Sequence, residues 1–207
     1  MFTGIVQTQA QVISVNNRNE FSQIIVGVDQ AWAKELALGA SIAINGVCLT
    51  VVSFEPQESN MHITFDVIDE TLSVSNLKAI CVDSTVNFER SLRLSDEIGG
   101  HQVSGHVHTK AALVEKTQTD DNCCLAFSCN ENWNKYILSK GFITINGVSL
   151  TIGEVGNDRF AVHLIPETLA RTNLSDLKIG DEVNLEFDQQ TMTIVTTLER
   201  MKAQQLI

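Results

Sequence analysis

The feature that most constrains this chain is an internal duplication. Residues 44–51 read INGVCLTV and residues 145–152 read INGVSLTI, a displacement of 101 positions (149 − 48). The same displacement places residues 2–6 on residues 103–107 without a gap. Self-similarity at a fixed spacing is the signature of a repeated structural unit. The chain is therefore expected to contain one fold twice.

The later part of the repeat is displaced by only 97 positions (166 − 69). The segment DETL at 69–72 matches PETL at 166–169, and VNFE at 86–89 matches VNLE at 183–186. A surface loop four residues shorter in the second copy would account for the change in spacing. The 207 residues divide into two units of about a hundred, enough for an independent core in each.

Alternation of apolar and polar residues predicts β-strands in both copies. Ile63, Phe65 and Val67 are separated by Thr64 and Asp66, the period-2 pattern of a half-buried strand. Six or so short strands in a hundred residues predict a small closed or nearly closed barrel.

Turn and cap signals occur at matched places. Asn-Gly pairs at 45–46 and 146–147 interrupt β-branched runs and supply residues that tolerate positive φ. Asp29 and Asn130 can each cap one brief helix, so each copy is expected to hold one.

The end of the chain lies outside the duplicated plan. Residues 191–207 contain no Gly or Pro and predict an amphipathic helix, with Ile194, Val195, Leu198 and Met201 on one stripe. The stripe can pack on its own barrel, or it can pair with the same helix in other subunits. The sequence pattern leaves both open.

Charge and cysteine content exclude several classes of partner. A net charge of −11 argues against nucleic acid and against an anionic membrane surface, so a small-molecule ligand is expected. The five cysteines fit neither a disulfide framework nor a zinc site, and they predict reduced thiols and no metal. The start of the chain lacks a basic segment followed by an apolar run, and no stretch is apolar enough to span a bilayer. A cytoplasmic protein is expected.

The two copies differ at positions that carry chemistry. Binding two like molecules favours repetition, whereas a reaction between them requires one to give and the other to accept. An imidazole titrates near ~6.5 and moves protons at neutral pH, and an ionised thiol adds to electrophilic carbon. The differing pairs, first copy then second, are Cys48 and Ser149, Ile5 and His106, and Ser91 and Asp188.

Each of these residues also has a purely structural interpretation. Cys48 can be a small core residue, and the Gly-rich segment 99–105 can be a plain linker in which His101 bonds locally. Asp188 can simply cap the terminal helix.

Five motifs in order resemble the riboflavin synthases of the alpha-chain type over essentially the whole length. They are MFTGIV at 1–6, NGVCLT at 45–50, GGH with SGH at 99–106, GVSLT at 147–151 and LIPETL at 164–169. The resemblance implies an all-β fold of two tandem, duplicated, six-stranded Greek-key barrels, residues 1–97 and 98–188. It also implies that the C-terminal α-helix, residues 189–207, associates three chains into a homotrimer.

The family reaction is a dismutation without cofactor or metal. Two molecules of 6,7-dimethyl-8-ribityllumazine exchange a four-carbon unit, giving riboflavin and 5-amino-6-(D-ribitylamino)uracil. The resemblance implies that one molecule lies on the first barrel of one subunit and the other on the second barrel of a neighbour. Proximity would then supply much of the acceleration. The sequence carries no information on docking to lumazine synthase, which makes the substrate.

The resemblance also implies the site residues. Cys48 would act as nucleophile or polariser, His106 as proton shuttle, and Ser149 with Asp188 as the pair that steers proton transfer. Phe2 would cover the ring edge. The first-barrel pocket would comprise Phe2, Thr3, Gly4, Ile5, Val6, Cys48, Leu49, Thr50, Asp66, Val67, Ile68, Asp69, Glu70 and Thr71. The second would comprise Gly105, His106, Val107, Lys140, Ser149, Leu150, Thr151, Leu164, Ile165, Pro166, Glu167, Thr168 and Leu169.

Two other functions are compatible with the same fold. Non-catalytic fluorescent antenna proteins bind lumazine or flavin in it, but they tend to lose the polar groups that this chain keeps at Cys48, His106, Ser149 and Asp188. FAD-dependent electron transfer is disfavoured because the Gly-rich dinucleotide turn is missing.

Overall fold

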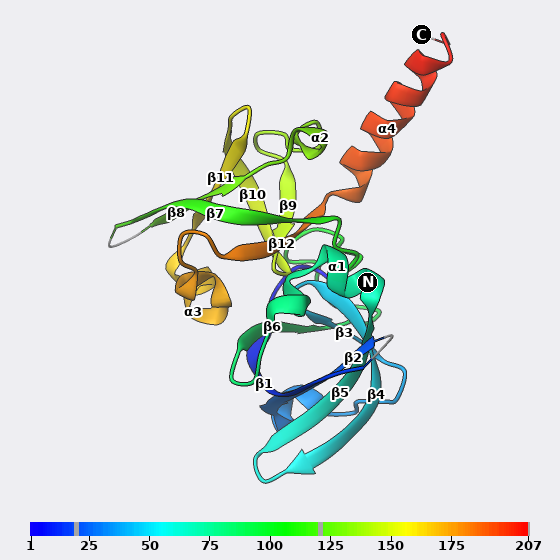
Figure 1. Cartoon of the computed structure of the whole chain (residues 1–207), viewed down its shortest axis with the longest axis vertical. Helices are drawn as coiled ribbons and strands as arrows, with labels where there is room; N and C mark the ends of the chain where they lie inside the picture. Colours follow the sequence, from blue (N-terminus) through cyan, green and yellow to red (C-terminus); the bar gives the residue numbers. More distant parts are fainter. Residues whose placement is uncertain (19–20, 120–121, 207) are drawn as a thin grey trace.

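The computed structural model describes residues 1–18, 21–119 and 122–206. It contains two closed six-stranded barrels and a terminal helix that projects from the second barrel (Figure 1). The strands of the first barrel are β1 (Thr8–Asn17), β2 (Phe21–Asp29), β3 (Ser41–Ile44), β4 (Val47–Gln57), β5 (Asn60–Ile68) and β6 (Thr85–Arg90). They pair in the cyclic order β1-β2-β5-β4-β3-β6.

The second barrel repeats this topology. Its strands are β7 (Thr109–Gln118), β8 (Cys123–Ser128), β9 (Phe142–Ile145), β10 (Val148–Val155), β11 (Arg159–Leu164) and β12 (Glu182–Phe187). Their order, β10-β11-β8-β7-β12-β9, is the same cycle with each strand number raised by six. The prediction of a duplicated barrel is confirmed.

Each barrel has its own core, built by the alternating residues that the sequence pattern singles out. Ile63, Phe65 and Val67 are almost fully buried in the first barrel, and Phe160 and Val162 in the second. The polar residues between them face outward, so the predicted faces of both strands are confirmed.

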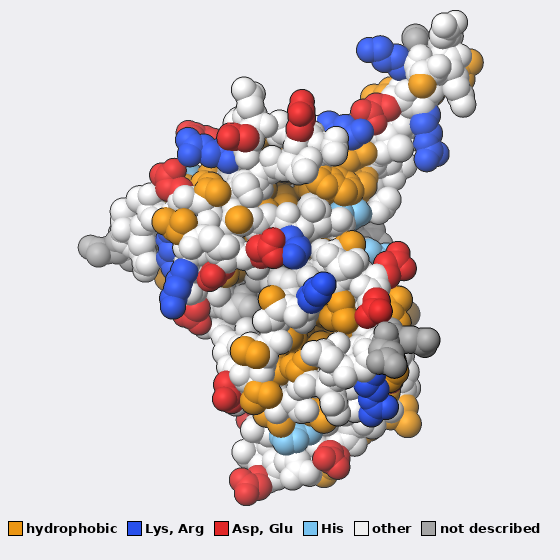
Figure 2. Space-filling view, viewed as in Figure 1, with side chains coloured by type: hydrophobic (Ala, Val, Ile, Leu, Met, Phe, Trp, Pro, Cys, Tyr) orange, Lys and Arg blue, Asp and Glu red, His pale blue; other side chains and the backbone are white. Residues whose placement is uncertain are grey.

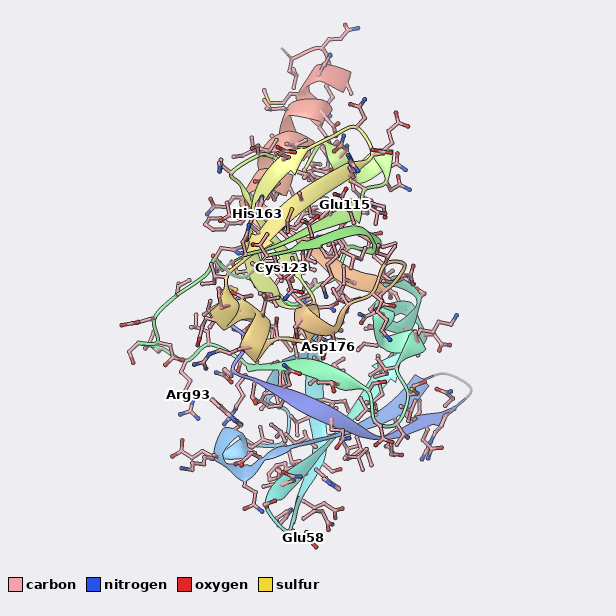
Figure 3. All side chains as sticks on the ribbon, turned by 90° about the vertical axis from the view of Figure 1, so that its left-hand side faces the viewer. Glu58, Arg93, Glu115, Cys123, His163 and Asp176 are labelled. Atoms are coloured by element: carbon pink, nitrogen blue, oxygen red, sulfur yellow. The ribbon has the colours of Figure 1, made fainter. Side chains whose placement is uncertain are left out.

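The four-residue difference in spacing lies in a hairpin. Strands β4 and β5 have 11 and 9 residues, whereas β10 and β11 have 8 and 6. The first hairpin therefore extends further, with Glu58 at its tip on the end of the barrel away from the second one (Figure 3). The expectation of a shorter loop is wrong: both strands are shorter in the second copy, whereas the loop between them is residues 58–59 in the first copy and residues 156–158 in the second.

The predicted caps and turns form. Asp29 accepts a hydrogen bond from the backbone of Ala31 at the start of the 3₁₀-helix η1 (Gln30–Ala33), and Asn130 caps α2 (Glu131–Asn134) in the same way. The Asn-Gly pairs at 45–46 and 146–147 join β3 to β4 and β9 to β10 with positive φ at all four residues.

The expectation of one brief helix per copy is wrong, because each barrel carries a further helical pair. These are α1 (Asp69–Val74) with η2 (Asn76–Ala79), and α3 (Pro166–Arg171) with η3 (Asn173–Asp176). None of the four has a side-chain hydrogen bond at its N-cap. The sequence does contain start signals, because Pro166 opens α3 and Ser75 and Thr172 occupy the N-cap positions of η2 and η3.

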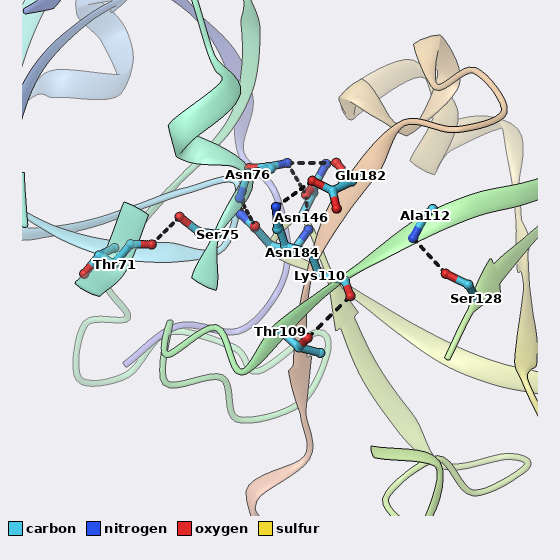
Figure 4. Close-up of polar contacts among 10 residues, drawn as sticks. All are labelled: Thr71, Ser75, Asn76, Thr109, Lys110, Ala112, Ser128, Asn146, Glu182 and Asn184. Atoms are coloured by element: carbon cyan, nitrogen blue, oxygen red, sulfur yellow. Dashed lines mark hydrogen bonds and ion pairs between the residues drawn. The ribbon is translucent and has the colours of Figure 1, made fainter. Parts of the chain in front are cut away.

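The barrels are joined by six asparagines, related in pairs by the duplication. The side chains of Asn76, Asn87, Asn173 and Asn184 each donate a hydrogen bond to a turn or strand of the other barrel. Figure 4 shows where Asn76, Asn146 and Asn184 meet. Asn87 donates to the carbonyl of Asn146 at 2.9 Å, and Asn184 donates to the carbonyl of Asn45 at 2.8 Å. This cluster, here called the asparagine lattice, comprises Asn45, Asn76, Asn87, Asn146, Asn173 and Asn184.

The terminal helix α4 spans Gln189–Ala203, so the predicted helix is present, and Ile207 lies outside the described residues. Asp188 accepts a hydrogen bond from the backbone of Thr191 at 2.8 Å and caps the helix. Within the described residues no helix is long and apolar enough to cross a bilayer. On the face drawn in Figure 2, Lys and Arg side chains are scattered among acidic ones.

Candidate functional site

The segments that precede the two barrels are exchanged between them. Phe2 and Val103 pair backbone to backbone, with N···O distances of 2.7 and 3.0 Å, so the two segments run antiparallel at the junction. Beyond this bridge, Val6 enters the core of the second barrel and Val107 packs against the core of the first. We call residues 2–6 strip A and residues 103–107 strip B.

Each strip covers the reactive position of the barrel that it crosses to. Ser149 donates its backbone N–H to the carbonyl of Gly4 at 2.8 Å, and Cys48 donates to the carbonyl of Gly105 at 2.9 Å. The structure thus defines a Ser149 site, formed with strip A, and a Cys48 site, formed with strip B. The predicted grouping of residues 4–6 with Cys48, and of residues 105–107 with Ser149, is wrong.

Both close approaches depend on glycine. Gly4 and Gly105 have φ values of 72° and 81°, a region that costs energy for residues with a Cβ. A Cβ on Gly4 would lie 2.6 Å from Cβ of Ser149, and a Cβ on Gly105 would lie 2.6 Å from Cβ of Cys48. Gly4 and Gly105 therefore allow each strip to lie directly against the barrel that it crosses to.

The Ser149 site opens into a hollow of ≈ 410 Å³. Of the predicted residues, Gly4, Ile5, Val6, Ser149, Glu167 and Thr168 line it. Sequence reasoning missed Gln7, Trp32, Arg171 and Thr172, which also line it. Gln7 and Trp32 belong to the first barrel, so this hollow is lined by residues of both barrels.

His101 completes the Ser149 site. Its Nδ1 lies 2.7 Å from Oγ of Ser149, its Nε2 lies 3.3 Å from Oγ1 of Thr144, and its ring stacks on Phe142 with the centroids 5.0 Å apart. The expected proton shuttle, His106, is exposed on strip B, beside the Cys48 site. The histidine that meets Ser149 is therefore His101, which the sequence left as a linker residue.

Burial lowers the pKa of His101 below the ordinary histidine value, and the negative charge of Asp188 opposes this effect. The ring is therefore neutral at neutral pH, with one nitrogen free to accept a proton. Asp188 and His101 line a second hollow of ≈ 320 Å³ at the base of α4. Asp188 thus caps the helix and faces the histidine at once.

The Cys48 site combines a backbone contact to strip B with a partly exposed thiol and three buried apolar side chains. Cys48 is partly exposed, and its side chain packs beside Phe2, Ala43 and Val103. Phe2 itself is fully buried, so it lies beneath the site and not over a ligand as expected. Among the other predicted residues of this barrel, Thr50, Asp66, Ile68, Asp69 and Glu70 are exposed, Thr71 is half-buried, and Thr3, Leu49 and Val67 are buried.

The remaining predicted residues of the second barrel divide between surface and core. In the part of the chain that the structure describes, Lys140 lies on the turn before β9 and lines neither hollow. Thr151, Ile165 and Pro166 are exposed, Leu169 is half-buried, and Leu150 and Leu164 belong to the core.

All five cysteines are unpaired, and Cys123 and Cys129 are buried in the second core. Burial raises the pKa of both thiols. Within the described ranges, no group of three or more His, Cys, Asp or Glu side chains could hold a metal ion.

Comparison with known proteins places these sites in context. The chain matches the family described as the lumazine binding domain twice, over residues 3–91 and 104–188. Riboflavin synthase of Escherichia coli (strain K12) is 45% identical over 204 residues, covering 98% of this chain and 94% of that protein. Riboflavin synthase of Chlamydia muridarum (strain MoPn / Nigg) is 40% identical over 208 residues, covering 100% and 99%.

Solved structures share the fold. LumP complexed with riboflavin superposes with a TM-score of 0.82 and 25% identity, covering 91% of this chain and 100% of that one. LumP complexed with 6,7-dimethyl-8-(1'-D-ribityl) lumazine gives a TM-score of 0.81 at 23% identity with the same coverage, a likeness of fold alone.

Proposed function

The chain belongs to the riboflavin synthase family, and we propose that it converts two molecules of 6,7-dimethyl-8-ribityllumazine into riboflavin and 5-amino-6-(D-ribitylamino)uracil. It is a transferase of riboflavin biosynthesis. The two products together contain every atom of the two substrates, so the exchange of the four-carbon unit consumes no oxidant, reductant or water.

One observation carries the mechanism: two sites with the same backbone frame hold different reactive groups. In each, a glycine carbonyl of the strip binds the backbone N–H of the residue after an Asn-Gly-Val turn. That residue is a thiol in one site and a hydroxyl in the other, namely Cys48 and Ser149. Equivalent frames suit two copies of one substrate, and unequal groups suit a donor and an acceptor.

The Ser149 site would remove the proton. A substrate molecule bound there has an acidic 7-methyl group, because the carbanion is delocalised into the pteridine ring. Ser149 donates its hydroxyl proton to Nδ1 of His101 as its oxygen takes up the methyl proton, while Nε2 donates to Thr144. The charge of Asp188 then stabilises the imidazolium. His101 thereby takes the role that the sequence assigned to His106.

The Cys48 site would hold the acceptor. The thiol of Cys48 is partly exposed beside strip B, where it can add to an electrophilic ring carbon or polarise it. The exposed His106 on the same strip is placed to exchange protons there.

The two sites of one chain face away from each other. Gly4 and Gly105 lie two residues from the Phe2–Val103 bridge in opposite directions, which corresponds to a separation on the order of 13 Å along the paired strips. Two substrates held by one chain would not touch. This separation supports a reaction centre shared between the Cys48 site of one chain and the Ser149 site of another.

We propose that α4 brings the chains together as a homotrimer. Its inner residues Met192 and Val195 pack on the second barrel, whereas Ile194 and Leu198 are 60% and 50% exposed. One side of α4 therefore packs on its own barrel, and another side exposes apolar residues that can contact other subunits. The five unpaired thiols support a cytoplasmic location.

The test begins with purified protein and 6,7-dimethyl-8-ribityllumazine alone, with riboflavin followed by absorbance. We expect the Cys48→Ser variant and the Ser149→Ala variant each to form riboflavin slowly when assayed alone. When the two variants are coexpressed, part of the wild-type rate should return. Hybrid assemblies would contain centres with Cys48 from one chain and Ser149 from another. If mass spectrometry detects hybrid assemblies and these remain inactive, the shared reaction centre is contradicted.

The second candidate is a non-catalytic lumazine or flavin carrier, which the likeness to ligand-bound LumP favours. A carrier would form a stable fluorescent complex with the same compound and release no riboflavin. The retention of Cys48, Ser149, His101 and Asp188 around two frames favours the enzyme.

A further inference from the structure

The last strand of each barrel carries a buried glutamate that the proposed chemistry does not use. Glu89 on β6 and Glu186 on β12 occupy equivalent positions of the duplication, and their residues are 4% and 5% exposed. Buried carboxylates are rare unless hydrogen bonds satisfy them. Their partners therefore indicate what they do.

Within the described residues, every hydrogen-bond donor to these two carboxylates lies on a strip. Oε1 of Glu89 accepts from the backbone N and from Oγ1 of Thr3, at 2.7 and 2.8 Å. Oε1 of Glu186 accepts from N and Oγ of Ser104, both at 2.7 Å, and its Oε2 accepts from N of Gly105 at 3.0 Å. Burial raises the pKa of each carboxyl, and these hydrogen bonds oppose the rise.

The contacts continue along each strip toward the reactive position. Oγ1 of Thr3 accepts from the backbone N of Ile5 at 3.2 Å, and Oγ of Ser104 accepts from the backbone N of His106 at 3.1 Å. Each glutamate thus fixes the residues before and after the glycine that contacts the opposite barrel. Glu89 holds the strip of the Ser149 site, and Glu186 holds the strip of the Cys48 site.

We propose that Glu89 and Glu186 are positioning residues, each belonging by sequence to one barrel and setting the geometry of the site on the other. The inference rests on the proposed function only for its catalytic meaning, because the positioning itself is a property of the free protein. Loss of Glu186 should loosen strip B over Cys48 and leave the Ser149 site intact. Loss of Glu89 should do the reverse.

A crossed alkylation experiment tests this without substrate. The full-length protein is treated with iodoacetamide, and modification is quantified peptide by peptide in two backgrounds. The wild-type thiol of Cys48 reports on strip B, and the thiol introduced by Ser149→Cys reports on strip A. Glu186→Gln should accelerate modification of Cys48 roughly tenfold, and Glu89→Gln should accelerate modification at position 149 by a similar factor, since each removes charge-assisted hydrogen bonds.

Controls separate positioning from general destabilisation. Glu182→Gln changes an exposed carboxylate on the same strand, ion-paired with Lys110 at 2.5 Å, and should change neither rate. If the Gln variants fold poorly, Ser104→Ala and Thr3→Val take their place. Each removes one strip hydroxyl with its bond to the glutamate and its bond to the next strip residue, keeps the backbone bond to the glutamate, and should show the same site preference more weakly.

Equal acceleration at both sites in either glutamate variant would overturn the proposal, and so would no acceleration in both the Gln and the strip-side variants. The result does not depend on turnover. A wild-type protein that makes no riboflavin but shows the crossed pattern would refute the proposed function and leave the positioning role standing.

Discussion

At the scale of single residues, the sites depend on two glycines and one histidine. Gly4 and Gly105 combine positive φ with contact distances that leave no room for a side chain. His101 joins a linker segment to Ser149 through one hydrogen bond. The two glycines decide how closely strip and barrel approach, and the histidine supplies the proton acceptor beside Ser149.

Gly4→Ala and Gly105→Ala are expected to abolish most activity and to destabilise the protein by about 1–3 kcal/mol more than backbone strain alone. Gly39→Ala and Gly180→Ala are matched controls, because both glycines have positive φ with no atom within 4 Å of the added Cβ. Urea unfolding and steady-state rates check the difference. Equal losses in all four variants would show that the contacts do not matter.

The lowered pKa of His101 predicts a pH dependence. Because burial favours the neutral ring, the base should be available above the ordinary value of about 6.5 and be lost by protonation only below it. We expect kcat/KM to fall on the acid side below about 6.5. In His101→Gln the rate should drop roughly a hundredfold or more and this limb should disappear. His62→Gln, on β5 of the first barrel, is the control, and an acid limb that persists in His101→Gln would contradict the assignment.

Residue types at the reactive positions could be predicted, but their neighbours could not. Comparing the two copies singled out Cys48, Ser149 and Asp188, because substitutions at equivalent positions are visible in one sequence. The pairing of His101 with Ser149 was missed, because it spans 48 residues and joins the segment before β7 to β10, which no local pattern indicates. The displacement of 101 aligns the strips with each other but does not indicate on which barrel each one lies.

At the scale of elements, strands were more predictable than short helices. Alternation identified the strands and their buried faces, and Asn-Gly identified the turns. The helical pair α1 and η2 and its counterpart α3 and η3 lack side-chain caps, so they are held by tertiary contacts such as buried Leu77 and Leu174. Their start signals, Pro166 in α3 and Ser75 and Thr172 before η2 and η3, do not by themselves distinguish so short a helix from a turn.

The terminal helix gives a prediction at this scale. Ile194→Asp and Leu198→Asp should lower the molar mass of the assembly, because each would place a charge where about 1.5–3 kcal/mol of apolar burial is expected. Activity should fall with assembly, while the fold of each chain remains. Light scattering coupled to gel filtration and far-UV circular dichroism provide the measurements. Thr193→Asp, on a different side of α4, is the control, and an unchanged mass in the first two variants would exclude this face from association.

At the scale of the whole molecule, the asparagine lattice makes two barrels into one body. Its bonds between the barrels are reciprocal: the side chain of Asn87 donates to the carbonyl of Asn146 at 2.9 Å, and the side chain of Asn184 donates to the carbonyl of Asn45 at 2.8 Å. Between the turns, a Cβ on Gly46 would lie 2.6 Å from the backbone N of Gly147. The two Asn-Gly turns are therefore in backbone contact, and the side-chain amides of the asparagine lattice hold the barrels together.

Asn87→Ala should destabilise the protein by about 2–5 kcal/mol, because it leaves the carbonyl of Asn146 and the N–H of Asn173 without their partners. Asn184→Ala, its equivalent, should cost a similar amount. Chemical denaturation measures both, with the exposed Asn60→Ala as control. A loss below about 1 kcal/mol in the two lattice variants would show that water replaces these bonds.

The exchange of strips also bears on the origin of the chain. A single barrel of this kind lacks the strip that completes its own site, because that strip comes from the other barrel and the exchange is mutual. A protein with only one such barrel would therefore have to form a two-fold symmetric homodimer. A covalent link between the two halves removes the requirement that they be identical, and a thiol at position 48 can then stand where the other half has a hydroxyl at position 149.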